Sequence, residues 1–218
     1  MKPRFSNQRN LALTLVEVLV VIAILAVIAA MFLPALAKAK RKSSRIGCVN
    51  CLKEIGLAYH EWEGDNSDKY PMSVSVTNGG AMELVATGNA VACFQVMSNE
   101  LSTPKILYCP DDMTHVATNS FAGLRSFNIS YFVEVDVTNE TNPQMILSGD
   151  DNFEIGSVPV KAGLLELSSN TPISWTAARH KFAGNIGIAD GSVQSLTADG
   201  LQKLLQQTGV ATNRLAIP

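Results

Sequence analysis

The stretch Val18–Leu33 reads VLVVIAILAVIAAMFL, sixteen residues without a polar side chain. Extended from Leu11 to Ala37, the apolar segment covers 27 residues and is interrupted only by Thr14, Glu17 and Pro34. A helix of about 20 apolar residues crosses the hydrocarbon core of a bilayer. The segment therefore predicts an N-terminal helix that can span a membrane.

Three kinds of segment share this pattern. A cleaved secretory signal would use the basic start before the run and Ala35-Leu36-Ala37 as its small-x-small site. The others are an uncleaved signal anchor and a precursor that is cut before the apolar run. Glu17 separates them, because an acidic residue at the start of a membrane helix costs free energy and a secretory signal gains nothing from it. The plainer explanation of Glu17 is that its side chain lies at the membrane interface and stays hydrated.

Residues 12–17 read A-L-T-L-V-E, after a basic stretch and before the apolar run. This string resembles the processing motif of the type IV pilin and type II secretion pseudopilin family. The resemblance implies cleavage by a membrane-embedded prepilin peptidase between Ala12 and Leu13, and methylation of Leu13. Glu17 then becomes the fifth residue of the mature chain and Pro34 takes the place of the family's helix proline. The chain departs from the family pattern in having Ala12 for the usual Gly and Leu13 for the usual Phe.

Helical periodicity continues beyond the membrane segment. Apolar residues recur at three- and four-residue steps on one face: Ile46, Val49, Leu52, Ile55, Tyr59 and Trp62. This pattern predicts a spine helix to about Glu63, ended by Gly64-Asp65-Asn66. The expected organisation is a leader at 1–12, a membrane and assembly helix at 13–37, a spine helix at 38–64 and a head at 65–218.

The head is expected to be α+β, with a small antiparallel sheet packed on the long N-terminal helix. Asp190-Gly191 between Ile186–Ala189 and Ser192–Leu196 is a strong hairpin signal. The other predicted elements are strands at Lys105–Tyr108, Ser126–Val137 and Met145–Ser148, short helices at Gln95–Leu101 and Leu201–Gln207, and a loop at 73–90.

Nine residues separate His180 from Asp190-Gly191. This spacing resembles the H-x9-DG signature of one group of prepilin-like proteins. The stretch Cys48–Ala58 and the triplet Tyr108-Cys109-Pro110 resemble the same group. A polar contact or metal pair between His180 and Asp190 is one interpretation. The plainer one, which we favour, is a turn aspartate beside a histidine that caps or packs.

The four cysteines leave alternatives open. Cys48 and Cys51 lie three apart on the predicted helix, where a bond between them would strain it. Zinc would need two ligands besides these, and Cys93 and Cys109 are available. In an oxidising compartment a long-range disulfide is favoured, such as Cys48 or Cys51 to Cys109, and free buried thiols are the remaining option.

Acidic loops raise the question of calcium, which needs clustered oxygen ligands. The candidates are Asp111-Asp112 and Asp150, Asp151 and Asn152 with Glu154. Neither cluster follows the EF-hand spacing, and solvated acidic loops are common, so no cofactor is predicted and calcium stays a secondary possibility.

No enzymatic role is expected, because the sequence holds no nucleophile elbow, P-loop, dinucleotide fingerprint or H-E-x-x-H motif. The net charge of −2, near −5 without the leader, gives no reason to expect nucleic acid as a partner. The resemblance implies a structural subunit of a pseudopilus or type IV pilus-like filament. Its partners would be the prepilin peptidase, other pilin-like subunits, the assembly machinery and the inner membrane, with the head in the periplasm. The alternative is a membrane-anchored binding domain that does not polymerise.

Overall fold

The computed structural model describes residues 14–218, which divide into two compact units. One unit ends at Lys42 and the other, the head, runs from Ser43 to Pro218. A single helix, α1 (Leu15–Asp65), contributes residues to both units. Its end at Asp65 confirms the predicted end of the spine helix, whereas the boundaries predicted at 37 and 64 stay predictions.

Within the head, α1 buries one face in the core. Its buried apolar side chains include Cys48, Leu52, Ile55, Tyr59 and Trp62. Ile46, which the periodicity placed on the same face, is about half exposed. Cys48 takes the buried position because its sulfur is bonded into the head, so the buried face begins two residues later than the apolar pattern alone suggests.

The head contains a six-stranded antiparallel sheet and a smaller three-stranded one. The order of the large sheet is β5-β9-β1-β2-β7-β8 and that of the small sheet is β4-β3-β6. The strands are β1 (Tyr131–Glu134), β2 (Ile146–Asp150), β3 (Phe153–Ile155), β4 (Val158–Pro159), β5 (Gly163–Ser168), β6 (Ile173–Trp175), β7 (Gly184–Ile188), β8 (Val193–Leu196) and β9 (Thr212–Ile217). Strand β9, last in the chain, pairs with both β5 and β1.

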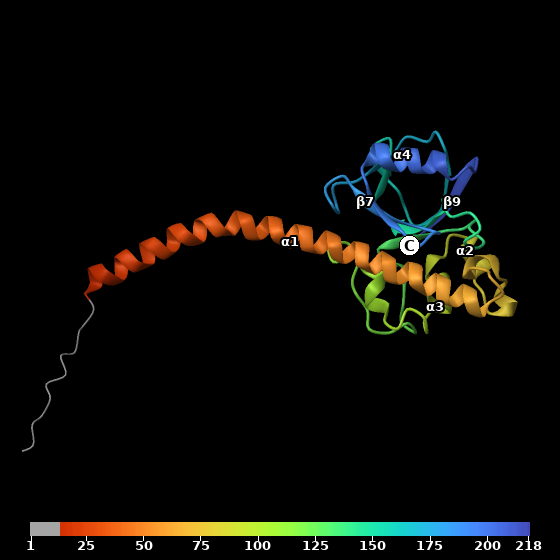
Figure 1. Cartoon of the computed structure of the whole chain (residues 1–218), viewed down its shortest axis with the longest axis horizontal. Helices are drawn as coiled ribbons and strands as arrows, with labels where there is room; N and C mark the ends of the chain where they lie inside the picture. The colour runs from red at the N-terminus through yellow and green to blue at the C-terminus, as the bar shows by residue number, and fades with distance from the viewer. Residues whose placement is uncertain (1–13) are drawn as a thin grey trace, which may run out of the picture. The chain divides into compact units, whose positions relative to one another are not determined.

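Both faces of the large sheet are covered, as Figure 1 shows for the head: the head portion of α1 lies on one side and α4 (Ala198–Gln207) on the other. Alternate residues of β1 accordingly enter two separate cores. Tyr131 and Val133 pack in the cluster that contains the α1 residues, and Phe132 packs in the cluster that contains the leucines of α4. Because both faces are buried, central strands lack the apolar–polar alternation of a half-exposed sheet.

Short helical elements complete the head on the α1 side of the sheet. They are α2 (Met82–Val85), α3 (Ala90–Val96) and the 3-10 turns η1 (Pro71–Ser73), η2 (Val76–Asn78), η3 (Pro104–Leu107) and η4 (Ser126–Asn128). The predicted loop at 73–90 is therefore wrong in part, since it contains η2 and α2. The helix predicted at Gln95–Leu101 is mostly wrong, because only Gln95 and Val96 belong to α3 and turns follow it. Helix α3 starts at Ala90, where the Asn89 side chain accepts a hydrogen bond from the Ala92 amide.

The strand predicted at Lys105–Tyr108 is wrong, because these residues fall mostly in η3. Pro104 stands in its first turn, and the Thr103 hydroxyl accepts from the Lys105 amide. The long strand predicted at Ser126–Val137 is also too long. Its first residues form η4, and only Tyr131–Glu134 pair in the sheet.

The hairpin predicted around Asp190-Gly191 is confirmed as β7 and β8, and the last predicted helix is confirmed as α4. The strand predicted at Met145–Ser148 is confirmed as β2 with a shift of one to two residues. A long N-terminal helix with an antiparallel sheet head confirms the α+β, pilin-like fold class.

Candidate functional site

The unit that ends at Lys42 presents apolar side chains without burying them. Every residue from Thr14 to Ser43 is exposed, although Val18–Leu33 is wholly apolar. Within the described residues, α1 is the one helix long and apolar enough to cross a membrane. Apolar surface of this extent marks a segment that a membrane or a protein partner covers.

Glu17 lies in the first turn of α1 and closes a capping box with Thr14. The Glu17 amide donates to the Thr14 hydroxyl (3.3 Å), and the Thr14 amide donates to the Glu17 carboxylate (2.7 Å). The Thr14 hydroxyl also donates to the same carboxylate oxygen (2.8 Å). The T-x-x-E capping pattern can be recognised in the sequence. The contact between Thr14 and Glu17 was not predicted, because Glu17 was considered only as a charge.

Pro34 lies inside α1, and the helix continues through it. Proline has no amide hydrogen, so the carbonyl of Ala30 lacks its usual helical donor. The predicted processing residues Ala12 and Leu13 lie outside the described residues.

In the head, a disulfide joins Cys48 of α1 to Cys109, which follows η3. The Cα atoms are 5.1 Å apart, 61 positions separate the two residues in the chain, and both side chains are fully buried. This is one of the long-range pairings that the sequence left open. Cys51 and Cys93 are free, and the Cys93 sulfur lies 3.3 Å from the Tyr59 hydroxyl.

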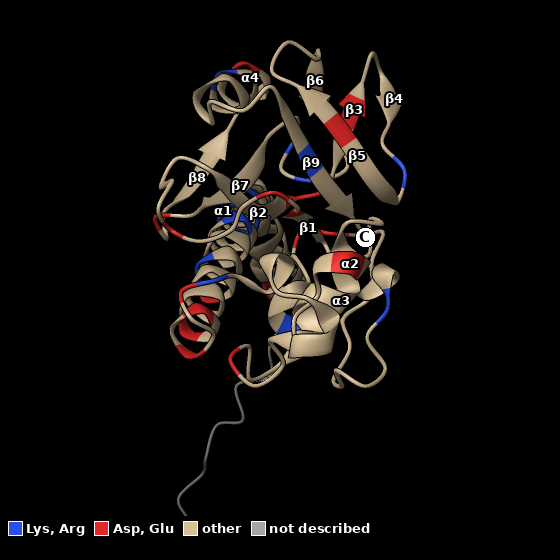
Figure 2. Cartoon of the chain, turned by 90° about the vertical axis from the view of Figure 1, so that its right-hand side faces the viewer, with Lys and Arg blue, Asp and Glu red and all other residues tan. Residues whose placement is uncertain are grey.

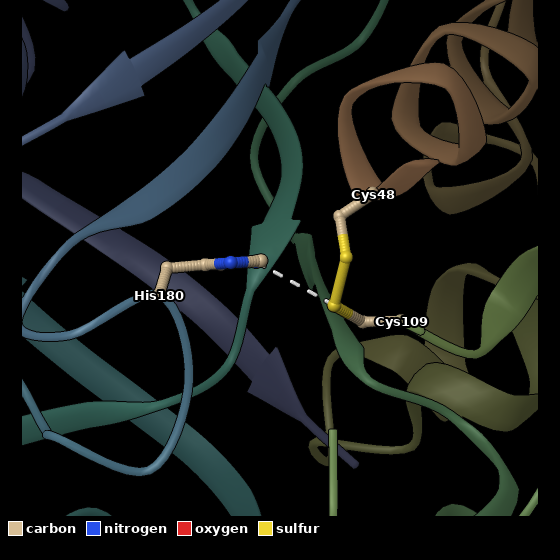
Figure 3. A group of neighbouring side chains, drawn as sticks. All are labelled: Cys48, Cys109 and His180. Carbon is tan, nitrogen blue, oxygen red and sulfur yellow. Dashed lines mark hydrogen bonds between the residues drawn. A yellow bond between two sulfur atoms is a disulfide. The ribbon is translucent and has the colours of Figure 1, made fainter. Parts of the chain in front are cut away.

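His180 points at this disulfide (Figure 3). Its Nε2 atom lies 3.5 Å from the Cys109 sulfur and 3.5 Å from the Asp150 carboxylate, and its Nδ1 lies 3.2 Å from Asp111. The His180 amide also donates to Asp111 (3.1 Å). His180, Lys181 and Phe182 all have φ between 49° and 59°, a left-handed backbone that costs roughly 1–2 kcal/mol per residue. Contacts to the ring and amide of His180 hold this turn in place.

A second set of polar groups surrounds Arg179, which is 3% exposed. Its guanidinium forms ion pairs with Asp112 (3.3 Å) and Asp151, and donates to the carbonyl of Ser130 (2.8 Å). Burial acts to raise the pKa of Asp112. The hydrogen bond from His115, the Arg179 charge and the other hydrogen bonds outweigh burial and hold that pKa well below its ordinary value.

Asp150 is the most enclosed carboxylate of the cluster. Burial raises its pKa, against the charges of His180 and Arg179 and two hydrogen bonds from Asn185. The three calcium candidates therefore face different partners: Asp150 meets Asn185, Asp151 meets Arg179, and Asn152 donates to the Thr176 carbonyl (3.5 Å).

The two halves of the H-x9-DG motif occupy different places. Asp190 accepts a hydrogen bond from the Ser192 amide (2.8 Å) at the tip of the β7–β8 hairpin, and Gly191 has φ of +80°, which favours glycine. The polar partners of His180 within residues 14–218 are Asp111, Asp150 and Cys109. This arrangement matches the turn aspartate and packed histidine of the plainer interpretation.

Sequence reasoning missed the groups that complete the cluster, namely Arg179, His115 and Ser130. Arg179 stands beside His180 in the chain, so an arginine adjacent to the motif histidine was the available signal. Ser130 carried no such signal, because only the fold brings it to Asp112. His115 lies three residues after Asp112, so the signal for this contact was local.

Comparison with known proteins gives one match. Residues 7–33 match the prokaryotic N-terminal methylation motif, a span that includes the predicted cleavage junction, Glu17 and the apolar run. No curated protein and no solved structure matches the chain. Pilin-like proteins with this motif are typically structural, and the motif indicates processing by a prepilin peptidase and association with other pilin subunits. The N-terminal segment of this chain is that of a type IV pilin-like prepilin.

Proposed function

We propose that the chain is a filament subunit, made as a prepilin, cut between Ala12 and Leu13 and methylated at Leu13. Helix α1 holds the subunit in the inner membrane with the head in the periplasm. The subunit then assembles into a type II secretion pseudopilus or a type IV pilus-like filament. The observation that carries the proposal is the exposed apolar part of α1, residues 15–42, whose single carboxylate, Glu17, lies close to its start.

Apolar burial supports assembly through α1. In the membrane, lipid covers the exposed side chains, and in a filament the same side chains of neighbouring subunits can cover one another. The membrane and filament states therefore differ little in apolar exposure. Polar groups at the start of the helix therefore determine which arrangement of neighbouring subunits is stable.

Glu17 supplies such a group. In the isolated subunit its carboxylate accepts hydrogen bonds from the amide and hydroxyl of Thr14. A mature chain that begins at Leu13 carries a positive amine four residues before Glu17, and every neighbouring subunit carries the same amine. A carboxylate and an amine that meet in an apolar interior lose much if either is removed. The pair would thus set the register between subunits.

The first test is the mass of the mature protein extracted from native membranes. We expect a chain that starts at Leu13 and is heavier by one methyl group. A chain that starts at Lys38 would instead identify residues 1–37 as a secretory signal, and the filament proposal would fail.

Glu17→Ala and Glu17→Gln test the charge pair. Both should lower incorporation into sheared filaments at least about tenfold, because each leaves a neighbour's amine unpaired. Both should remain in the membrane after carbonate extraction. Glu17→Gln is the matched variant, because its amide oxygen can still accept from Thr14 and preserve the cap. Normal incorporation of Glu17→Gln would show that capping, rather than charge, is what assembly needs.

A further inference from the structure

His60, Glu63 and Glu140 bring three metal-ligating side chains together in the head, away from the disulfide cluster. His60 and Glu63 are three residues apart on α1 and so share one face of the helix. Glu140 comes from the segment between β1 and β2. The His60 Nδ1 atom lies 3.5 Å from Glu63 Oε2 and 3.6 Å from Glu140 Oε2, and the three candidate ligand atoms all lie within 4.8 Å of one another.

Glu63 is held in place by a separate contact. The Glu140 amide donates to Glu63 Oε1 (3.2 Å), which leaves Oε2 directed at His60. Glu63 is 5% exposed, so its carboxylate is fixed by packing as well as by hydrogen bonding. A carboxylate oriented through one oxygen, with the other free to bind, is the arrangement that outer-shell hydrogen bonds give to metal ligands.

These side chains open into an acidic hollow of about 610 Å³. Asp68 and Asp190 also line it, so that four carboxylates face the hollow and its lining within the described chain includes neither lysine nor arginine. Figure 2 shows the acidic colouring at the end of α1. The tip of the β7–β8 hairpin is close by, since a Cβ atom on Gly191 would lie 3.7 Å from His60 Nε2.

Tyr70 provides an independent observation. Its side chain is fully buried, its hydroxyl has no hydrogen-bond partner within residues 14–218, and its ring packs edge-on against His60 with centroids 6.0 Å apart. A buried hydroxyl without a partner, on a ring that packs against His60, indicates that a further polar group belongs next to it.

We propose that His60, Glu63 and Glu140 bind one divalent transition-metal cation, with zinc as the preferred ion. Two ligands of a tetrahedral zinc, each roughly 2.0–2.1 Å from the metal, lie roughly 3.4 Å apart. The distances from His60 Nδ1 to the two carboxylates are close to that value. One imidazole with two carboxylates suits zinc better than calcium, which takes oxygen ligands. Water in the hollow supplies the remaining position. The ion would fasten the end of α1 to the segment before β2.

The test is a zinc titration of the full-length chain in detergent micelles, after EDTA treatment and against a chromogenic competitor. We expect one zinc per chain at micromolar free zinc. His60→Asn and Glu140→Gln should each weaken the affinity at least about tenfold. Glu140 has an exposed side chain, so its variant leaves the fold intact. The matched control is Glu61→Gln, an exposed carboxylate between the two helix ligands, with less than a twofold effect.

Three results would overturn the proposal. The first is absence of zinc binding by the unmodified chain. The second is unchanged affinity in Glu140→Gln, which would show that Glu140 is not a ligand and that its contact with His60 is a polar contact only. The third is a loss of affinity in His115→Asn equal to that in Glu140→Gln, which would assign the ion to the group of Asp112, His115 and Asp151. Cobalt in place of zinc should show no thiolate absorption, since the free thiols Cys51 and Cys93 are not ligands.

Discussion

Replacing Cys48 and Cys109 together by alanine is expected to lower the free energy of unfolding of the head by about 4 kcal/mol. The bond closes a chain segment of 61 positions, and the chain-entropy estimate for a loop of that length is about 4 kcal/mol. The disulfide also ties the buried face of α1 to the segment that carries Asp111, which holds His180. Losing it removes the covalent link between these two parts of the head.

Urea unfolding of the detergent-solubilised chain measures this effect through tryptophan fluorescence. Both tryptophans, Trp62 and Trp175, are buried in the head and report on its packing. Cys51→Ala is the matched control. It removes a free, half-buried thiol from the same helix and should cost well under half as much. Equal unfolding curves for the double variant and the unmodified chain would contradict a stabilising role for the disulfide.

The stability of the head is expected to fall as the pH rises from about 5 to about 8, and Glu134 is the main cause. Its side chain is fully buried in β1. Burial raises its pKa from 4.5 to about 8, against the hydrogen bond from the Arg214 amide (3.1 Å). Between these two values the folded head keeps a proton that the unfolded chain releases. Stability therefore declines by about 1.4 kcal/mol per pH unit, or about 4–5 kcal/mol in all.

Glu134→Gln should remove most of this decline, because an amide does not ionise. At pH 9 the variant is expected to be more stable than the unmodified chain by several kcal/mol, whereas at pH 5 the two should be similar. A residual slope is expected from Asp150, whose pKa is also raised by burial. Asp112 has a lowered pKa, so its contribution is lost only below about pH 4 and does not enter this window.

Urea midpoints at pH 5, 7 and 9 measure the slope, and Glu54→Gln, an exposed carboxylate on α1, is the matched control. The control should keep the full decline with pH. If Glu134→Gln keeps it too, the buried carboxylate is not the group that titrates.

Local sequence predicted those elements whose formation depends on neighbouring residues. Asp190-Gly191 predicted its hairpin because the left-handed conformation at Gly191 is a local requirement. The same kind of reasoning failed at Lys105–Tyr108, where β-forming side chains suggested a strand. The local cap from Thr103 and the proline at Pro104 favour a 3-10 turn there.

Strands β5 and β9 were missed for a different reason. Their pairing partners are distant in the chain, with Leu164 opposite Ala216 and Ser168 opposite Thr212. Neither segment is flanked by a tight turn to its partner. A sheet edge of this kind is stabilised by tertiary pairing rather than by propensity, so a scan for local signals has nothing to detect.

The sequence by itself determined the N-terminal part of this protein. Sixteen apolar residues in a row and a single nearby glutamate define a helix and its surroundings without reference to any other segment. Only the tertiary structure decided that Cys48 pairs with Cys109, that His180 meets Asp111 and Asp150 rather than Asp190, and that His60 shares a hollow with Glu140. These groups lie tens of residues apart, and their distances depend on how the sheet and α1 pack, which no local pattern encodes.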